Sequence, residues 1–393
     1  MLLINNYQAL TPQFNFTAPA VSFLASEEIV WTNYYFLLFF VMFYTIFLLI
    51  SNIYMLNKLT SISNLRYSFL SWMLPGDQIL RVLFFFLLML LTYVSTIYGP
   101  SSSIWYSHMI VDSLQIKLIT TALILFLIIS VMLHTNLVYV NTSSYDLLIV
   151  VLGLYLWLSL LFFSSNLFTI IFFLEILSIT VMLFNSASLF YNNLSLKKLN
   201  FSNNNYFMLN LPFYQTASLM YFFWISFIAS VSLFFYLLFF IYYFNTLDIF
   251  LLEYLFNFLS SSFSFVDLIT FSFIWFGFLF CIFLKCGLVP FYIWKPLFFK
   301  GLSYIYIFVY TTFYYFLLLI FFLLFFYLYF FELFTYFIYI NIVFLLVGLV
   351  TIFSLFLNNT YLKSFFAISS ILNTLLVFIA LLSYNYLTIP YCY

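Results

Sequence analysis

Two ionisable side chains lie inside long apolar runs. Glu175 falls within LFTIIFFLEILSITVMLF, and Lys285 falls within LFCIFLKCGLVPFYIWKP. An ionised group in hydrocarbon is costly, so it must be protonated, paired or hydrated, and it usually faces a pathway. Glu175 therefore predicts a proton or ion site, the alternative being a neutral carboxyl bonded to a neighbouring helix. Lys285 predicts a proton relay, the alternative being a lysine that extends to the nearby membrane interface.

The segment after Lys285 predicts a broken helix. Gly287 and Pro290 follow within a few residues. Pro290 has no N–H, so the carbonyl of Cys286 loses its helical partner, and the helix should kink or end here. Such a break is tolerated at membrane depth only where it faces protein or a water-filled cavity.

The remaining reactive residues predict neither a metal site nor a cofactor site. Cys281, Cys286 and Cys392 form no CxxC pair, and His108 and His134 lie near span ends or in a loop, where we interpret them as interface residues. The chain contains no Gly-rich phosphate loop, no nucleophile triad and no basic tract for nucleic acid.

The elements that must position these residues are membrane-spanning helices. Of the 393 residues, 67% are hydrophobic and only 5% are charged, whereas a soluble domain has about 25% charged residues. A spanning helix needs about 20 mainly apolar residues. The sequence therefore predicts an all-α integral membrane protein with about ten spans, at 31–56, 80–98, 117–140, 145–164, 166–190, 216–244, 266–293, 303–331, 334–357 and 363–387.

The loop charges favour one orientation of these spans. One side of the membrane receives eight basic residues and the other receives only Lys117, while most acidic residues lie on the second side. The positive-inside rule then places both termini opposite the cation-rich side. The cations of that side are Lys58, Arg66, Arg81, Lys197, Lys198, Lys295, Lys300 and Lys363. We interpret Lys197, Lys198, Lys295 and Lys300 as topology anchors.

Four segments, in order, resemble a known family. LKCGLVPFYIWKPLFFKG at 284–301 resembles the K-x-G-x-x-P-F-H-x-W-x-P…G segment of the antiporter-like subunits of respiratory complex I, most closely subunit 2 of NADH:ubiquinone oxidoreductase. LFTIIFFLEILSI at 167–179 is similar to the segment that carries the family's essential glutamate. TASLMYFFWISFIAS at 216–230 and NTYLKSFFAISSILN at 359–373 are weaker matches.

The resemblance implies a fold of about fourteen helices with an inverted five-helix repeat and a broken seventh helix. On this chain it implies an N-terminal segment with three helices (1–140), a first repeat (141–331) and the first two helices of an incomplete second repeat (332–393). Several family positions differ here. The lysines of the sixth and eighth spans fall on Met220 and near Tyr315, and the family histidines fall on Tyr292 and Asn373.

The expected function is that of a subunit of the proton-pumping membrane arm, with Glu175 and Lys285 as a charge relay and no cofactor in this chain. The expected location is the mitochondrial inner membrane, with both termini towards the intermembrane space. Expected partners are other complex I membrane-arm subunits, lipid and a separate chain of about four helices that completes the fold. The alternatives are a stand-alone cation/proton antiporter and a structural complex I subunit that has lost pumping.

Overall fold

The computed structural model describes the chain from residue 102 onward, with several gaps. The described residues are 102–104, 108–111, 113–140, 145–199, 210–260, 265–288, 291–292, 294–330, 337–357 and 361–382. The first two expected spans, 31–56 and 80–98, and both chain termini lie outside the described residues.

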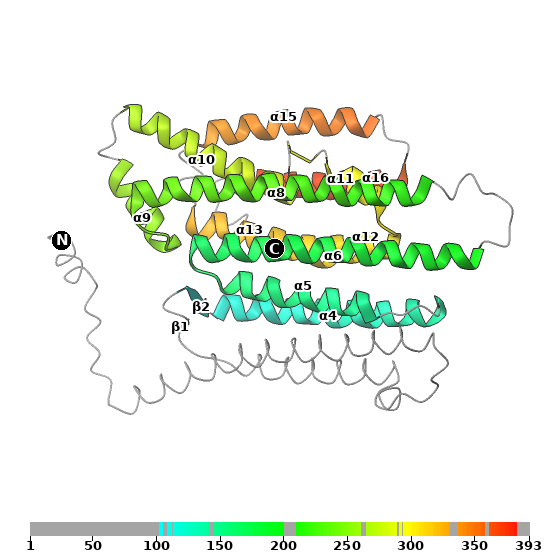
Figure 1. The fold of residues 1–393 in the computed structure, drawn as a ribbon. Helices are drawn as coiled ribbons and strands as arrows, with labels where there is room; N and C mark the ends of the chain where they lie inside the picture. Colours follow the sequence, from blue (N-terminus) through cyan, green and yellow to red (C-terminus); the bar gives the residue numbers. More distant parts are fainter. Residues whose placement is uncertain are drawn as a thin grey trace, which may run out of the picture.

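The described part of the chain is predominantly helical, and its long helices run roughly side by side (Figure 1). The helices are α4 (Ser113–Val140), α5 (Tyr145–Phe163), α6 (Leu167–Leu199), α8 (Asn210–Phe244), α9 (Ile249–Ser260), α10 (Phe265–Cys286), α11 (Trp294–Gly301), α12 (Tyr304–Val309), the π-helix η2 (Tyr310–Tyr315), α13 (Phe316–Tyr329), α15 (Ile338–Leu357) and α16 (Leu362–Leu382).

Four of the described helical segments are long and apolar enough to cross a membrane: Leu167–Ser186, Thr216–Phe244, Asp267–Cys286 and Tyr304–Phe326. Shorter apolar helical segments cover Leu114–Ser130, Val150–Phe163, Asn341–Leu357 and Leu362–Leu376. These eight segments overlap eight of the expected spans. They confirm a helical membrane protein, while the number of about ten spans and the antiporter-like fold stay predictions.

Four short elements, two strands and two helices, were not expected from the apolar runs. Strands β1 (Ser102–Ile104) and β2 (Met109–Val111) form an antiparallel hairpin, with Ser103 opposite Ile110. Helices α9 and α11 occupy segments that were expected to be loops. Each is too short to span a bilayer, so a search for runs of about 20 apolar residues passes over it.

The hairpin and two inter-helix links meet at one end of the bundle. Met109 forms a β-bridge with Ser164 before α6, and Asn166 forms one with Asp248 before α9. The Leu167 N–H also donates to the Leu247 carbonyl at 3.0 Å. Backbone groups that leave the helices therefore find partners among themselves, as they must where water is scarce.

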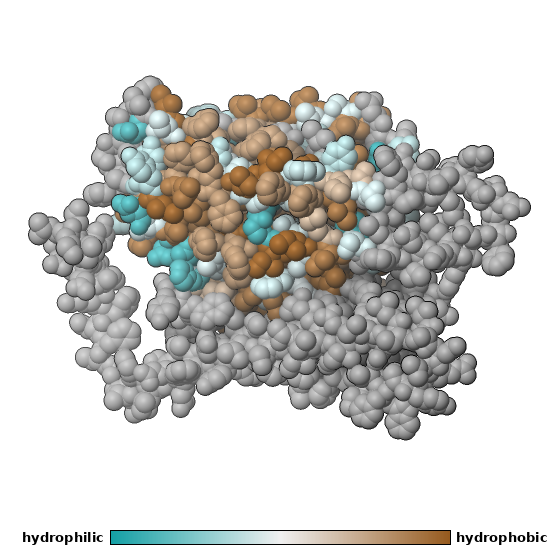
Figure 2. All heavy atoms as spheres, in the orientation of Figure 1, coloured by the Kyte–Doolittle hydropathy of each residue, from teal (hydrophilic) through white to brown (hydrophobic). Residues whose placement is uncertain are grey.

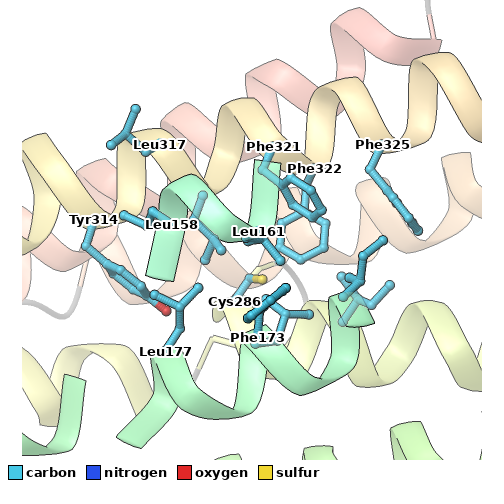
Figure 3. Packing of buried hydrophobic residues seen from close by; sticks show 14 of the residues in the cluster. Leu158, Leu161, Phe173, Leu177, Cys286, Tyr314, Leu317, Phe321, Phe322 and Phe325 are labelled. Carbon is cyan, nitrogen blue, oxygen red and sulfur yellow. The ribbon is translucent and has the colours of Figure 1, made fainter. Parts of the chain in front are cut away.

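The core is built largely from aromatic and branched side chains between the helices. Figure 3 shows Cys286, at the end of α10, among Leu158 and Leu161 of α5, Phe173 of α6 and Phe321 of α13. Large apolar side chains also cover the outside, as expected where lipid is the solvent. Figure 2 shows this brown surface across the visible face, with hydrophilic residues mostly at the end near α9 and the hairpin.

Candidate functional site

The structure brings Glu175 and Lys285 together in an ion pair. Lys285 Nζ, in the last turn of α10, donates a hydrogen bond to Glu175 Oε1, in the third turn of α6. Helix α8 packs against both of these helices and so fixes their spacing. The side chains of Lys285 and Glu175 are 6% and 25% exposed. The Lys285 side chain therefore points into the protein. The alternative, that it extends to the membrane interface, is wrong.

Gly287 ends α10 immediately after this lysine. Its φ of 63° is left-handed, a conformation that glycine adopts without the steric cost of a Cβ. The Gly287 N–H donates to the Leu284 carbonyl at 3.3 Å, and the Leu288 N–H donates to the Phe283 carbonyl at 2.8 Å. These two bonds are those of a Schellman C-cap. Lys285 thus lies beside the negative end of the α10 dipole, which favours its charged form.

The helix break predicted near Gly287 and Pro290 is present, but its expected cause was incomplete. Residue 290 lies outside the described residues. The helix has already ended at Cys286, before that proline, because Gly287 turns the backbone out of the helical conformation. Gly287 is thus sufficient to account for the end of α10.

The residues that follow the break pack back against the end of α10. The Trp294 indole Nε1 donates to the Leu284 carbonyl at 3.0 Å, which adds a partner for a carbonyl at the end of α10. The Lys295 N–H bonds the Tyr292 carbonyl at 2.9 Å and starts α11. A Cβ on Gly287 would lie 2.9 Å from Trp294 Cζ2, closer than normal packing allows. Glycine is therefore required here for its conformation and for space.

Lys295 was expected to be a topology anchor near the interface, and this expectation is wrong. Its side chain is 0% exposed, and its Nζ has no hydrogen-bond partner among the described residues. Nζ lies 3.2 Å from the centroid of the Tyr315 ring. The Lys295 side chain therefore belongs to the protein interior beside the ion pair rather than to the membrane surface.

The packing of α11 explains why Lys295 is buried. Phe298 and Phe299 contact Tyr310 of η2, with ring centroids 5.2 and 5.5 Å apart. Lys295, Phe298 and Phe299 are spaced i, i+3 and i+4, so they share one face of the helix. That spacing is the one sequence signal that could have identified Lys295 as an interior residue.

Two neighbouring lysines lie closer to the edge of this region. Lys363 Nζ donates to the Leu302 carbonyl at 2.6 Å, just beyond the C-terminus of α11. A cation at this position complements the helix dipole. Lys300 lies over the Tyr361 ring, with Nζ 4.8 Å from its centroid. These two lysines tie the end of α11 to the start of α16.

The positions that depart from the family pattern have different surroundings. Met220 lies on α8 and is 58% exposed, on an outward face of that helix. Tyr315 is buried against Lys295, and Tyr292 is buried near Ile368 and Ile371. Asn373 is exposed on α16. Only Tyr315 among them lies in direct contact with a charged group in the described structure.

Other reactive residues take no part in the pair. His108 Nδ1 lies 3.2 Å from Asn166 Nδ2 at the hairpin end of the bundle, and the His134 side chain lies outside the described residues. Cys281 Sγ donates to Ser232 Oγ at 3.0 Å. Within the described part of the chain, no cluster of His, Cys, Asp and Glu has the arrangement of a metal site.

The fold and this site define a membrane-embedded helical protein with an inward-facing ion pair at a helix break. No model of a known protein family matches the chain. A search of curated proteins finds no match either.

Proposed function

We propose that this chain is a subunit of the proton-pumping membrane arm of NADH:ubiquinone oxidoreductase in the mitochondrial inner membrane. The observation that carries the proposal is the Glu175–Lys285 ion pair, which joins two apolar helices directly before the break at Gly287. A charged pair of this kind is costly inside a membrane, and such residues usually belong to a proton or ion pathway. Redox chemistry belongs to other subunits in this proposal.

The pair works as a charge relay. While the Glu175 carboxylate lies close to Lys285, it stabilises the ammonium form of the lysine. When the two side chains separate, that stabilisation is lost and Lys285 releases its proton. The end of α10 at Gly287 gives this movement a natural pivot, because the backbone there leaves the regular helical hydrogen bonding.

The relay is tested by Glu175→Gln in inner-membrane vesicles that contain the assembled complex. We expect proton pumping to fall at least about tenfold, because a positioned proton-transfer group typically contributes about 10² or more in rate. Electron transfer from NADH to ubiquinone should fall less. Pumping is followed with a pH-sensitive dye and electron transfer by NADH oxidation.

The matched control for this variant is Asp267→Asn. Asp267 lies in the first turn of α10, at the opposite end of the helix from Lys285. The control loses the same charge but leaves the relay intact, so pumping should be retained. Undiminished pumping in Glu175→Gln would instead favour a structural subunit that does not pump.

The proposed partners are other membrane-arm subunits and a separate chain of about four helices that packs on α15 and α16. Both helices carry wide exposed apolar faces: Val343, Leu346, Val347, Val350 and Phe353 on α15, and Phe365, Phe366, Leu372, Leu376 and Ile379 on α16. Helices in lipid associate through close packing and interhelical hydrogen bonds, so these faces suit a further helix. In this proposal the partner carries a second broken helix with a lysine near mid-membrane.

Native electrophoresis followed by mass spectrometry tests the assembly. The chain should migrate with a very large complex, and a small helical membrane protein should co-purify with it.

A map of that complex should show protein beside α15 and α16, and both termini of this chain should face the intermembrane space. Migration as a single chain would favour a stand-alone cation/proton antiporter, a class that also uses broken helices at the membrane midplane. Finding only lipid beside α15 and α16 would contradict the proposed partner chain of about four helices.

A further inference from the structure

Lys295 is the second buried cation of this region, and the relay described above does not use it. Its side chain is fully buried, and Nζ has no hydrogen-bond partner in the described part of the chain. Lysine is almost never fully buried unless it is paired. An ammonium without an acceptor is strongly disfavoured in such a place, and the neutral amine is the form that burial tolerates.

Among the described residues, the Tyr315 ring is placed to stabilise a charge here, because its centroid lies 3.2 Å from Nζ. The face of an aromatic ring attracts a cation, and the attraction is strongest where water is excluded. A buried lysine over this ring therefore has two accessible states. The amine is favoured by burial, and the ammonium is favoured by the ring.

The backbone that presents this ring is itself irregular. Tyr315 is the last residue of the π-helix η2, between the α-helices α12 and α13. Single π-helical turns are rare and occur frequently at functional sites. The Lys295 amine therefore lies over an aromatic ring at a distorted turn inside an apolar core.

Lys295 is also adjacent to the Glu175–Lys285 pair. A Cβ on Gly287 would lie 3.3 Å from Lys295 Cδ, so the lysine stem passes directly over the turn that ends α10. Lys285 lies two residues before the same glycine. The two lysines therefore meet at one turn, where Lys285 contacts Glu175 and Lys295 contacts Tyr315.

We propose that Lys295 is a second proton-carrying site, in series with Lys285; this inference rests on the function proposed above. When Lys285 and Glu175 separate, the Lys285 ammonium passes its proton to the neutral Lys295 amine, directly or through water. Lys285 becomes a neutral amine, and Lys295 becomes an ammonium over the Tyr315 ring. Lys285 then takes a new proton from the input side and pairs again with Glu175, while Lys295 releases its proton onward.

Three variants, in vesicles with the assembled complex, test the proposal. Lys295→Met replaces the lysine with an apolar side chain of similar length that cannot carry a proton. Pumping should therefore fall at least about tenfold. The amount of assembled complex should be unchanged or higher, because a buried unpaired cation has been replaced by an apolar group. Lys295→Arg keeps a charge that cannot be released, and it should also fail to pump. The control Lys300→Met removes the other cation of α11 and should pump normally.

The results separate a proton carrier from a structural cation. Normal pumping in Lys295→Arg, or poor assembly with normal pumping per complex in Lys295→Met, would overturn the proposal. If Glu175→Gln stops pumping while Lys295→Met pumps normally, the relay stands and the second site is wrong. If both variants pump normally, the second site and the function proposed above are both wrong.

Discussion

Lys285→Met should both stop proton pumping and destabilise the protein. The substitution leaves Glu175 in the membrane without the cation that it contacts. Removing one partner of a buried pair typically costs about 3 to 5 kcal/mol, because the other charge stays uncompensated. Glu175 is 25% exposed, so we expect a loss near the lower end, about 3 kcal/mol. The thermal unfolding midpoint of the complex in detergent, and its abundance in the membrane, measure this loss.

The double variant Glu175→Gln with Lys285→Met separates stability from function. Neither residue is then charged, so no buried charge lacks a partner, and most of the lost stability should return. Proton pumping should stay absent, because neither group can transfer a proton. If the single variant Lys285→Met is as stable as the wild type, the ion pair does not exist in the assembled protein. Recovery of pumping in the double variant would exclude the relay.

Gly287→Ala should strongly disrupt the turn that ends α10. Alanine at a φ of 63° adopts a left-handed conformation, at a cost of about 1 to 2 kcal/mol. Its Cβ would also lie 2.9 Å from Trp294 Cζ2, and overpacking of this kind costs about 1 to 3 kcal/mol. Because Lys295 packs on the same turn, we expect reduced assembly and slower pumping together. Unfolding midpoint, membrane abundance and dye-monitored pumping check the three effects.

The double variant Gly287→Ala with Trp294→Phe tests the two causes separately. Phenylalanine lacks the outer indole carbons that the alanine methyl would meet, so the steric part of the loss should recover and the conformational part should persist. Trp294→Phe alone is the control. It removes the bond from Nε1 to the Leu284 carbonyl, which is worth about 1 kcal/mol. An unchanged unfolding midpoint in Gly287→Ala would show that the Gly287 cap does not hold the end of α10.

Several features of this protein follow from the sequence alone. Runs of about 20 apolar residues have no stable state in lipid other than a helix, so the helical membrane class follows from composition. Glu175 and Lys285 stand out because a charge in such a run needs a partner, and the structure pairs them with one another. The sequence also predicts a break near Gly287 and Pro290, but it assigns the cause to the proline, whereas in the structure the left-handed Gly287 ends the helix.

Tertiary structure decided the role of Lys295. In the sequence it resembles Lys300, five residues later on the same short helix, and both fit a cation-rich loop. Packing separates them: one face of α11 lies against the π-helix, which places Lys295 over Tyr315, while Lys300 lies over Tyr361 near the start of α16. No local pattern predicts a π-helix between Val309 and Phe316. Which side of an eight-residue helix is buried depends on contacts with residues far away in the chain, and those contacts form only when the helices pack.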